Sequence, residues 1–393
     1  MAEFRIFLFS PYCLLRPTTN RIYDMRLSDA LAGQGAEVRV VYPYTYMKEN
    51  IRQNEIRKNY SLKHGVTTHM LWTPLLENSA KSWRFVVMML AFFFTSLRIA
   101  FSTLITGKPA VILSRDAKSL IPVLFLKKLF GKNLRVKTVF IAAEVKSSKL
   151  FTWVMKHTDG VLAGVSTARD AIRKIVPLDE NRFTLSLSPV PVSDIQCSKE
   201  DARKEIKYAS QQPLVVYTGK LGMDVNELRY IFEAAKLLPS YHFMFTGGRA
   251  SAVEAVRNYC SANGIQNVSF TGFFNEAAYV RYFQLAADVL VSYYTSKDHM
   301  VEFNYPAKIN EYMTTGNPVV TPDFPATRDV LNDRNVLFVK PDDPLALANG
   351  IQKLVEDKAL AARLAEQARL DVQHLTFDAK AGELIRFLEQ LPG

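Results

Sequence analysis

The chain has 393 residues, 48% of them hydrophobic and 22% charged, which excludes a disordered protein and predicts two domains with full-sized cores. Its three widely spaced cysteines, Cys13, Cys197 and Cys260, argue against a disulfide framework and favour a reducing compartment. The net charge of +11 lies in the first half: residues 1–195 hold 28 Lys and Arg against 14 Asp and Glu, and the remainder holds 21 against 24.

The first half alternates short apolar runs with helical patterns. It begins with MAEFRIFLFSPYCLL, in which Glu3 precedes the apolar run and no small-residue cleavage site follows. We therefore expect a strand rather than a signal peptide, and a cytoplasmic protein. Strands are predicted at 4–10, 37–43, 110–115, 135–141 and 160–166, and helices at 21–35, up to residue 129 and after Lys146. This alternation indicates a parallel sheet with helices on both faces.

The most apolar stretch is FVVMMLAFFFTSLRIAFSTLI, at 85–105. It nearly reaches the ~20 residues of a membrane span, but Arg98 would cost roughly 2.5–3.5 kcal/mol near a bilayer centre. Our first expectation is a helix largely buried in a domain. The second interpretation is a helix lying in the membrane interface, with its flanks Lys81, Arg84 and Lys108 on anionic headgroups, and the third is a true span.

The segment 81–149 is strongly basic, with 13 Lys and Arg and only two acids, Asp116 and Glu144. Such a segment favours an anionic partner, whether a membrane surface, a nucleic acid or a phosphorylated substrate, and a solvated basic face is the plainer alternative. No aromatic-basic motif of a nucleic-acid reader is present. We therefore expect no nucleic-acid partner and a peripheral contact with an anionic membrane through 81–149.

The pattern weakens around 177–213 and then restarts. Strands are predicted at 213–219, 242–248, 268–273 and 336–340, with helices at 227–239 and 251–264. We expect an N-terminal Rossmann-like domain at 1–190, a C-terminal one at 191–376, and a helix at 377–393 that could pack back on the first domain. Two halves of this kind place a ligand crevice between them, at the carboxyl ends of the strands.

The second half resembles retaining GT-B glycosyltransferases, the large family numbered four, through the ordered motifs VVYTGKL, FTGG, VSFTGFF, AADVLVSYY and PAKINEYMTTGNPVVTPDF. The resemblance covers 213–355 well, and 1–175 more weakly through RLSDALAGQGAEVRVVYP and DGVLAGVSTARDAI. It implies an α/β fold of GT-B architecture, with two Rossmann-like doubly wound parallel-sheet domains facing a central cleft. The N-terminal domain would bind the acceptor, and the C-terminal domain a nucleoside-diphosphate-sugar.

The resemblance gives roles to the segment YPAKINEYMTTGNPVV, at 305–320. Glu311 resembles the glutamate that holds the ribose hydroxyls, a task that suits a carboxylate because it accepts two hydrogen bonds from a vicinal diol. Lys308 fits the P-x-K-x-x-E-Y variant of this motif, in which an ammonium near a helix start pairs with a diphosphate. An intrahelical Lys–Glu pair, worth about a few tenths of a kcal/mol, is the structural alternative.

Other positions resemble donor-binding residues of the same family. Lys220, directly after Gly219, matches the first basic residue on the donor phosphates, where positive charge stabilises the departing diphosphate; a surface lysine in a turn is the alternative. Glycine at 219 and 222 would let the backbone approach a ligand closely. Gly248, in TGG, would flank the nucleotide, and Phe273, in TGFF, would meet the base through main-chain groups.

Three positions depart from the family pattern. Phe303 stands where the first of two glutamates would be, with Glu302 beside it. Residues 224–226 hold Asp, Val and Asn where a second phosphate-binding basic residue would fall, and Arg229 or Lys308 could substitute for it. Ala143 stands where the family often has a histidine near the sugar. These departures leave open a GT-B-like protein that has lost catalysis.

Further candidates lie in loops. Glu144 follows a strand whose end should open the crevice, so it could orient the sugar or the acceptor hydroxyl, or pair with a neighbouring lysine. Thr18, Thr19 and Asn20, in RPTTNRI, could donate hydrogen bonds to the donor phosphate. Asn304 and Tyr305 would line the sugar pocket if their loop matches the family.

No histidine set has metal-ligand spacing and no paired-carboxylate motif appears, so we expect neither a metal nor a cofactor. The catalytic candidates are Glu144, Lys220 and Glu311. We expect a retaining hexosyltransferase, cytoplasmic or peripheral on the inner face of the cell membrane. Its acceptor would be a glycan or lipid-linked molecule of polysaccharide or lipopolysaccharide assembly. A soluble acceptor and a catalytically degenerate binding protein are the alternatives.

Overall fold

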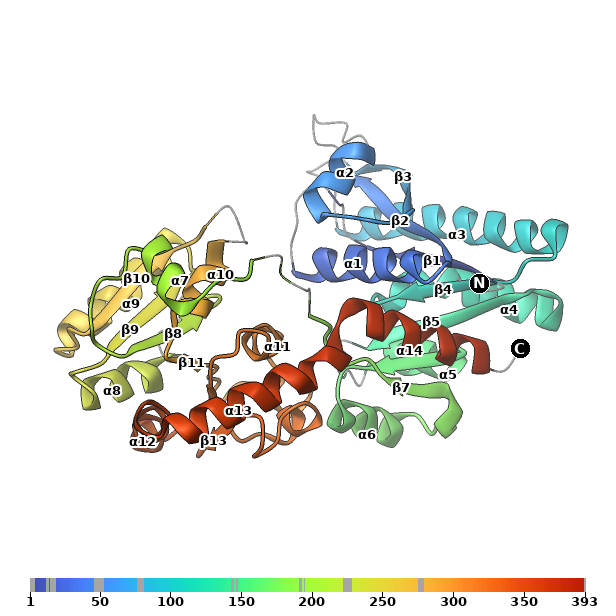
Figure 1. Cartoon of the computed structure of the whole chain (residues 1–393). Helices are drawn as coiled ribbons and strands as arrows, with labels where there is room; N and C mark the ends of the chain where they lie inside the picture. Colours follow the sequence, from blue (N-terminus) through green and yellow to red (C-terminus); the bar gives the residue numbers. More distant parts are fainter. Residues whose placement is uncertain are drawn as a thin grey trace. The chain divides into compact units, whose positions relative to one another are not determined.

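The computed structural model describes residues 4–11, 14, 19–45, 53–75, 81–142, 145, 148–190, 193, 195–221, 228–274 and 279–391. The chain divides into two compact units (Figure 1). Unit 1 comprises Met1–Leu187 together with Phe377–Gly393, and unit 2 comprises Ser188–Thr376. The domain boundaries expected from the sequence were 190/191 and 376/377.

Unit 1 is built on a seven-stranded parallel sheet of order β3-β2-β1-β4-β5-β6-β7. The first strand in the sequence is internal and pairs on both sides, with Ile6 opposite Val38 in one neighbour and opposite Val111 in the other. The order reverses between β1 and β4, and in open sheets of this kind ligands bind at the carboxyl ends of the strands beside such a reversal. The strands are β1 (Arg5–Phe9), β2 (Glu37–Thr45), β3 (Thr67–Leu75), β4 (Ala110–Ser114), β5 (Val136–Ala142), β6 (Gly160–Ala163) and β7 (Phe183–Leu185).

Helices cover both faces of this sheet, because its strands are buried and apolar on both sides. One core cluster joins the sheet to α1, α2 and α14, and the other joins it to α3, α4, α5 and α6. The helices are α1 (Thr19–Gly33), α2 (Gln53–Tyr60), α3 (Lys81–Thr106), α4 (Ala117–Phe130), α5 (Lys149–His157), α6 (Ser166–Ile175) and α14 (Phe377–Gln390), with 3-10 turns η1 (Gly131–Asn133) and η2 (Glu180–Arg182).

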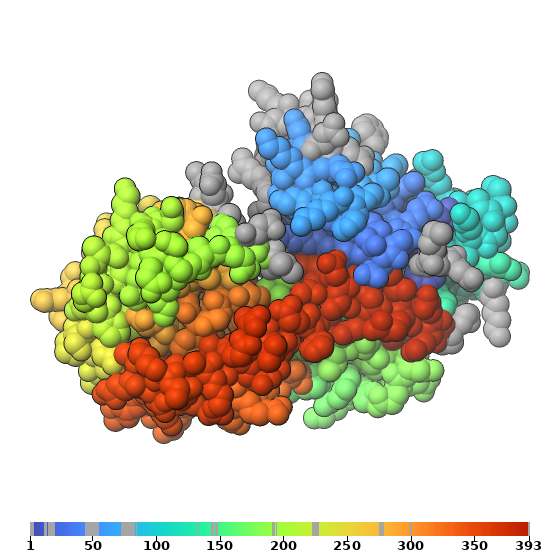
Figure 2. Space-filling view, in the orientation of Figure 1, coloured from blue at the N-terminus to red at the C-terminus, as the bar shows by residue number. Residues whose placement is uncertain are grey.

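The last helix returns to the first unit. In Figure 2 the red C-terminal segment lies against the blue N-terminal one, and α14 packs on α1. Ala381, Leu384 and Leu388 of α14 are buried in the same cluster as Leu31 of α1. Lys137 of β5 also donates from Nζ to the Leu391 carbonyl at 2.6 Å. The C-terminal residues are therefore part of the unit 1 core.

Helix α3 corrects our first expectation for 85–105. By length and composition α3 could cross a membrane. A core helix would be mostly buried, whereas only 22% of the most apolar window of α3 is buried inside the protein. A largely buried core helix is therefore the wrong interpretation. One face of α3 packs on the sheet and on α4 of unit 1. The opposite face is exposed, because the sheet and α4 contact the helix from one side only.

Unit 2 repeats the plan with six parallel strands of order β10-β9-β8-β11-β12-β13, reversing between β8 and β11. The strands are β8 (Leu214–Thr218), β9 (His242–Thr246), β10 (Val268–Gly272), β11 (Val289–Val291), β12 (Val319–Pro322) and β13 (Leu337–Val339). The helices are α7 (Lys199–Glu205), α8 (Arg229–Leu237), α9 (Ala250–Ala262), α10 (Val280–Ala286), α11 (Lys308–Met313), α12 (Pro344–Glu356) and α13 (Lys358–Asp371), with 3-10 turns η5 (His299–Glu302), η6 (Pro325–Asp329) and η7 (Val372–Leu375).

Both units are thus doubly wound α/β units with parallel sheets, which confirms the predicted fold class. The sequence analysis missed β3 and β7 at the two edges of the unit 1 sheet. Strand β3 contains polar residues and Pro74 in place of a regular alternation, and β7 has only three residues, so neither carries a periodic signal.

Candidate functional site

The carboxyl ends of β8, β9 and β10 meet at one edge of the unit 2 sheet and carry glycines. Gly219, Gly247, Gly248 and Gly272 have φ values of 143°, 121°, 85° and 75°, a region that favours glycine. The Gly247 amide donates to the Gly272 carbonyl at 2.9 Å. A Cβ on Gly247 would lie 2.1 Å from the Gly219 carbonyl oxygen. The sequence therefore leaves a surface of bare backbone here, which a ligand can approach closely.

Lys308, the first residue of α11, reaches this edge. Its Nζ lies 3.7 Å from the centre of the Tyr217 ring and 5.5 Å from that of Tyr294, and a Cβ on Gly219 would be 3.1 Å from it. Removal from water lowers the pKa of Lys308 to about 7, although Glu311 acts in the opposite direction. The ammonium is thus only partly charged at neutral pH, and an anion beside it would favour the charged form.

Glu311 follows one turn later on the same helix. Its Oε2 accepts a hydrogen bond of 3.2 Å from Nε2 of Gln284, which also lies 3.3 Å from Oγ1 of Thr218. Gln284 is buried, so its side-chain amide restrains the Glu311 carboxylate from the interior of unit 2. The buried guanidinium of Arg281 binds the Glu311 carbonyl at 3.2 Å and fixes the helix end. Glu311 itself is half-buried, and its contact with Gln284 links it to Thr218 at the end of β8.

Tyr312 ties α11 to the end of β8. The side chain is completely buried, and its hydroxyl accepts from the Thr218 amide at 2.8 Å and donates to the Thr218 carbonyl at 3.2 Å. Burial raises the pKa of this phenol above its usual range. The tyrosine of the P-x-K-x-x-E-Y motif therefore braces the helix that carries Lys308 and Glu311 against the strand that ends at the glycines.

The loop before α11 is held from inside the unit. Tyr305 is 4% exposed, and its hydroxyl donates to the Ser188 carbonyl at 3.3 Å and accepts from Nδ2 of Asn310 at 3.0 Å. The exposed Asn304 accepts from the Tyr305 amide at 2.9 Å. These contacts give the Tyr305 ring a structural role, and its place in a sugar pocket stays a prediction.

Other predicted residues of unit 2 lie around the same edge. Lys220 is exposed, and its carbonyl accepts from the Tyr217 hydroxyl at 3.4 Å. Phe273 is 73% exposed directly after β10. Arg229 opens α8 with its guanidinium 4.8 Å from the Tyr230 ring centre, so it is turned onto that ring. Residues 222–227, with the departure at 224–226, lie outside the described residues.

In unit 1 the structure describes fewer of the predicted site residues. Glu144 and Ala143 lie outside the described residues, as does Thr18. Thr19 begins α1, although its side chain is not among those described, and Asn20 is exposed in the first turn. Their roles toward a donor phosphate stay predictions. Among the residues that the structure describes, no group of three or more metal-ligating side chains forms.

The sequence analysis missed a buried ion pair beside the β1–β4 reversal of unit 1. Nε of Arg115, directly after β4, lies 2.9 Å from Oδ1 of Asp24 on α1, and its guanidinium lies 3.7 Å from the Tyr23 ring centre. Asp24 is 1% exposed, and burial raises its pKa to about 6 although Arg115 opposes the rise. The available signal was the charged Arg115 directly after the apolar run AVILS, at the end of the strand predicted at 110–115.

Comparison with known proteins accords with this geometry. Residues 212–357 match the family model described as glycosyl transferases group 1. Among solved structures, sucrose-phosphate synthase from Thermosynechococcus elongatus aligns with a TM-score of 0.72 at 18% identity, covering 99% of both chains. HepE of Anabaena, in complex with UDP and glucose, aligns with a TM-score of 0.72 at 12% identity, covering 98% of this chain and 99% of HepE.

A lipopolysaccharide outer core galactosyltransferase, WaaB, aligns with a TM-score of 0.69 at 10% identity, covering 98% of each chain. No curated protein matches the sequence. At these identities the structural likenesses establish the fold, and the family model matches residues 212–357, which are less than half of the chain.

Proposed function

We propose that the protein moves a hexose from a nucleoside-diphosphate-sugar to an acceptor with retention of configuration, because residues 212–357 match the family model described as glycosyl transferases group 1. One observation carries the proposal. Lys308 and Glu311 project from one braced helix at the glycine-lined edge of the unit 2 sheet. A cation, a carboxylate and bare backbone are the groups that a diphosphate joined to a ribose requires.

In this proposal the diphosphate lies on Gly219 with Lys308 and Lys220 at its oxygens. Glu311 accepts the ribose hydroxyls, and Gln284 keeps its carboxylate oriented. Gly248 flanks the nucleotide, and the backbone at Phe273 meets the base. Asn304 lies beside the sugar in this proposal, and the roles of Tyr305, Thr19, Asn20 and Glu144 stay predictions from the sequence. The negative charge that develops on the departing diphosphate would be stabilised by the two lysines rather than by a metal, so the proposed transfer is metal-independent.

The proposed step is a front-face displacement. The bond between the anomeric carbon and the leaving phosphate oxygen breaks, and the acceptor oxygen bonds to the same carbon on the same face. The acceptor hydroxyl proton passes to an oxygen of the departing diphosphate, so no separate base is required. Because Lys308 lies at that diphosphate, its charge would be felt most strongly as the bond breaks.

We further propose a glycan or lipid-linked acceptor of polysaccharide or lipopolysaccharide assembly, at the inner face of the cell membrane. The basic segment 81–149 supports an anionic surface as partner. A soluble acceptor remains the alternative for the same donor chemistry. HepE is solved with UDP and glucose, so a UDP-sugar is the first donor to test.

The test is a thermal-shift panel with UDP, GDP, ADP and their sugar conjugates on the wild-type chain and on Glu311→Ala. A ligand at 100 times its Kd adds about 2.7 kcal/mol to the free energy of unfolding. We expect a shift with one nucleotide, lost in Glu311→Ala and kept in Glu233→Ala, a carboxylate change on α8. No shift with any nucleotide in folded protein would favour the catalytically degenerate protein instead.

A further inference from the structure

The outer face of α3 is a continuous apolar stripe. Six large apolar residues of this stripe are between 43% and 82% exposed: Trp83, Val86, Leu90, Phe94, Phe101 and Ile105. They recur every three or four residues, except that Arg98 stands between Phe94 and Phe101. Arg98 occupies the same stripe and is also exposed. A run of large apolar side chains this long is unusual on a protein surface that meets only water, and such patches mark interaction sites.

The opposite face of α3 is fixed in unit 1. Phe92, Ser96, Ile99 and Thr103 are buried, and the Phe92 ring lies 5.0 Å from that of Phe9 in β1. Crossing a bilayer would expose this inner face to lipid and break its contacts with the sheet. The helix can therefore present its stripe to a surface while it stays part of the folded unit.

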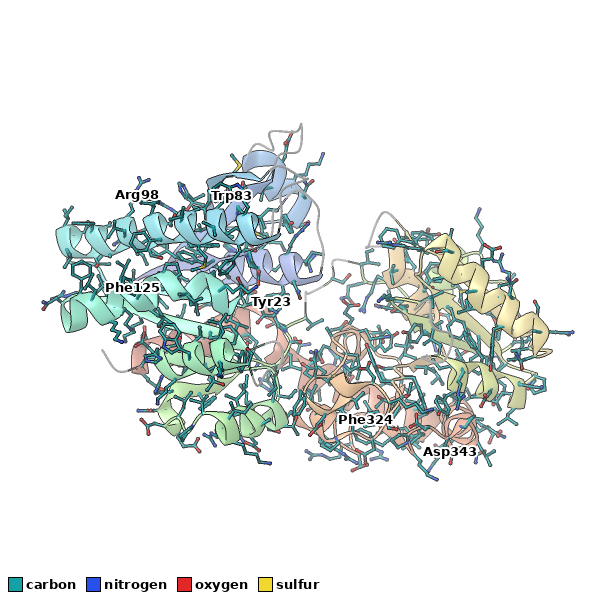
Figure 3. The ribbon with its side chains drawn as sticks, turned by 180° about the vertical axis from the view of Figure 1, so that it is seen from behind. Tyr23, Trp83, Arg98, Phe125, Phe324 and Asp343 are labelled. Carbon is teal, nitrogen blue, oxygen red and sulfur yellow. The ribbon has the colours of Figure 1, made fainter. Side chains whose placement is uncertain are left out.

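Helix α4 extends the same surface. It packs beside α3, and Figure 3 shows Phe125 on α4 next to the helix that carries Trp83 and Arg98. Phe125 is 57% exposed and Leu129 66%, one turn apart. Helix α4 lies within the basic segment 81–149, for which the sequence predicts a peripheral contact with an anionic membrane. We call the outer sides of the two helices the α3–α4 face.

The charges on this face have one sign. Lys118 and Lys128 of α4 are exposed beside the apolar residues, and Nζ of Lys118 lies 5.5 Å from the Phe85 ring centre. Asp116 is the only acid between residues 81 and 142 of the sequence. Long basic side chains can lay their stems on apolar surface and keep their charges in the headgroup layer. Arg98 in the middle of the stripe fits this arrangement.

We propose that the α3–α4 face is a monolayer-docking surface, in which both helices lie in the plane of an anionic lipid membrane and insert their apolar stripe among the headgroups. Apolar insertion and basic charge together are the two attractions that hold an interfacial helix. The proposal takes the lipid-linked acceptor from the proposed function, but binding to lipid is measured without any transfer reaction. A second copy of this chain is the other occupant that the same face would accept.

The test is flotation of the full chain with vesicles of phosphatidylcholine and phosphatidylglycerol, compared with phosphatidylcholine alone. We expect binding to the anionic vesicles that weakens with salt. Phe94→Ser combined with Phe101→Ser should lower the partition coefficient at least about tenfold, because each phenylalanine loses part of its transfer from water. Arg98→Gln combined with Lys128→Gln should lower it on anionic vesicles by a similar factor, since each basic residue near such a surface contributes about 1 kcal/mol.

The matched control is Leu237→Ser combined with Leu370→Ser, two leucines of unit 2 that are each 50% exposed. It should bind vesicles as the wild type does. All these side chains face solvent, so melting temperatures should change little. Fluorescence adds a second measurement: Trp83, 57% exposed, should give a blue-shifted emission with anionic vesicles that Trp83→Phe removes.

Several outcomes would overturn the proposal. Equal flotation of the phenylalanine and leucine variants would do so, as would a wild-type chain that stays at the bottom of the gradient with anionic vesicles. If light scattering shows a dimer that Phe94→Ser with Phe101→Ser converts to a monomer, without effect on flotation, the face joins two copies instead. A nucleotide thermal shift that persists while flotation fails would leave the proposed transfer intact, and the reverse result would remove the transfer but keep the docking surface.

Discussion

The Nζ of Lys308 lies 3.7 Å from the centre of the Tyr217 ring, at the point where β8 ends in Gly219. An aromatic face attracts a cation but replaces only part of its hydration. This explains how the ammonium can be removed from water while its pKa falls to about 7. We therefore expect an anion bound beside Lys308 to favour its charged form.

Binding of a nucleoside diphosphate should therefore be accompanied by proton uptake at Lys308. Below pH 7 the lysine is already charged, and above pH 7 affinity should fall towards tenfold per pH unit until the pKa of the complex is passed. Isothermal titration in buffers of different ionisation enthalpy measures the uptake. Lys308→Arg keeps a permanent charge and should lose this part of the pH dependence. Identical pH profiles for both proteins would contradict the assignment.

Without nucleotide, Lys308→Met should raise the free energy of unfolding at pH 7. The pKa of Lys308 is lowered from 10.5 to about 7 by folding, so between these values the unfolded chain binds more protons. Stability contributed at this position then rises with pH across that window and is lowest below it. Urea unfolding at pH 7 and pH 10 measures the effect, with the exposed Lys236→Met as a charge control. A less stable Lys308→Met would show that the charged form is favoured in the fold.

Tyr312→Phe should cost about 1–3 kcal/mol of stability, because the buried Thr218 amide loses its acceptor. Tyr279→Phe is the matched control: its hydroxyl donates to the Glu205 carbonyl at 2.8 Å in an exposed position, where water can replace it. Chemical denaturation compares the two. Nucleotide affinity should also fall in Tyr312→Phe, since α11 loses its tie to β8. Equal costs for both variants would argue against the brace.

Gly247→Ala should be destabilising beyond the cost of its backbone angle. Its Cβ would meet the Gly219 carbonyl oxygen at 2.1 Å, whereas a Cβ on Gly264, also at positive φ, meets nothing within 4 Å. Gly264→Ala should therefore cost about 1–2 kcal/mol from the left-handed conformation alone. Gly247→Ala should cost about 1–3 kcal/mol more, from the displaced backbone. Thermal unfolding of the pair checks this, and similar melting temperatures would refute the close approach.

Arg115→Gln should raise the pKa of Asp24 further above its value of about 6, because burial raises it and Arg115 opposes that rise. In the wild type the folded chain holds more protons between pH 3.8 and 6, so the free energy of unfolding from this group falls as pH rises through that window. Carbon-detected NMR titration follows the carboxyl. The pKa of Asp343 is lowered by the Ala346 amide and should not respond. An Asp24 pKa near 4 would exclude the burial described here.

Much of the architecture could be read from residue patterns. The runs FRIFLFS and VVYT are largely apolar on both faces, which predicts buried parallel strands. The glycines at the ends of β8, β9 and β10 marked the edge where a ligand could approach. Glu311 and Lys308 were found through the resemblance of their segment to the P-x-K-x-x-E-Y motif, which lies within a short stretch of sequence. Strands β3 and β7 escaped because edge strands are short or partly polar.

Other features depended on contacts between distant segments. Nothing in the sequence places Tyr312 on Thr218 or Gln284 under Glu311, because those partners are separated by 94 and 27 residues. The same holds for Arg115 and Asp24, 91 residues apart. The pKa of Lys308 is likewise a consequence of what surrounds it, since local sequence gave only an ordinary lysine.

The sequence by itself determined two doubly wound units, the donor-like motif and an apolar helix in a basic segment, since composition and periodicity are carried by neighbouring residues. Only the tertiary structure decided which side of that helix is covered. Phe92 lies inside and Phe94 outside, two residues apart in the same apolar run. Hydrophobicity alone cannot separate them, because burial depends on where the sheet and the neighbouring helix are, and those are fixed by contacts far along the chain.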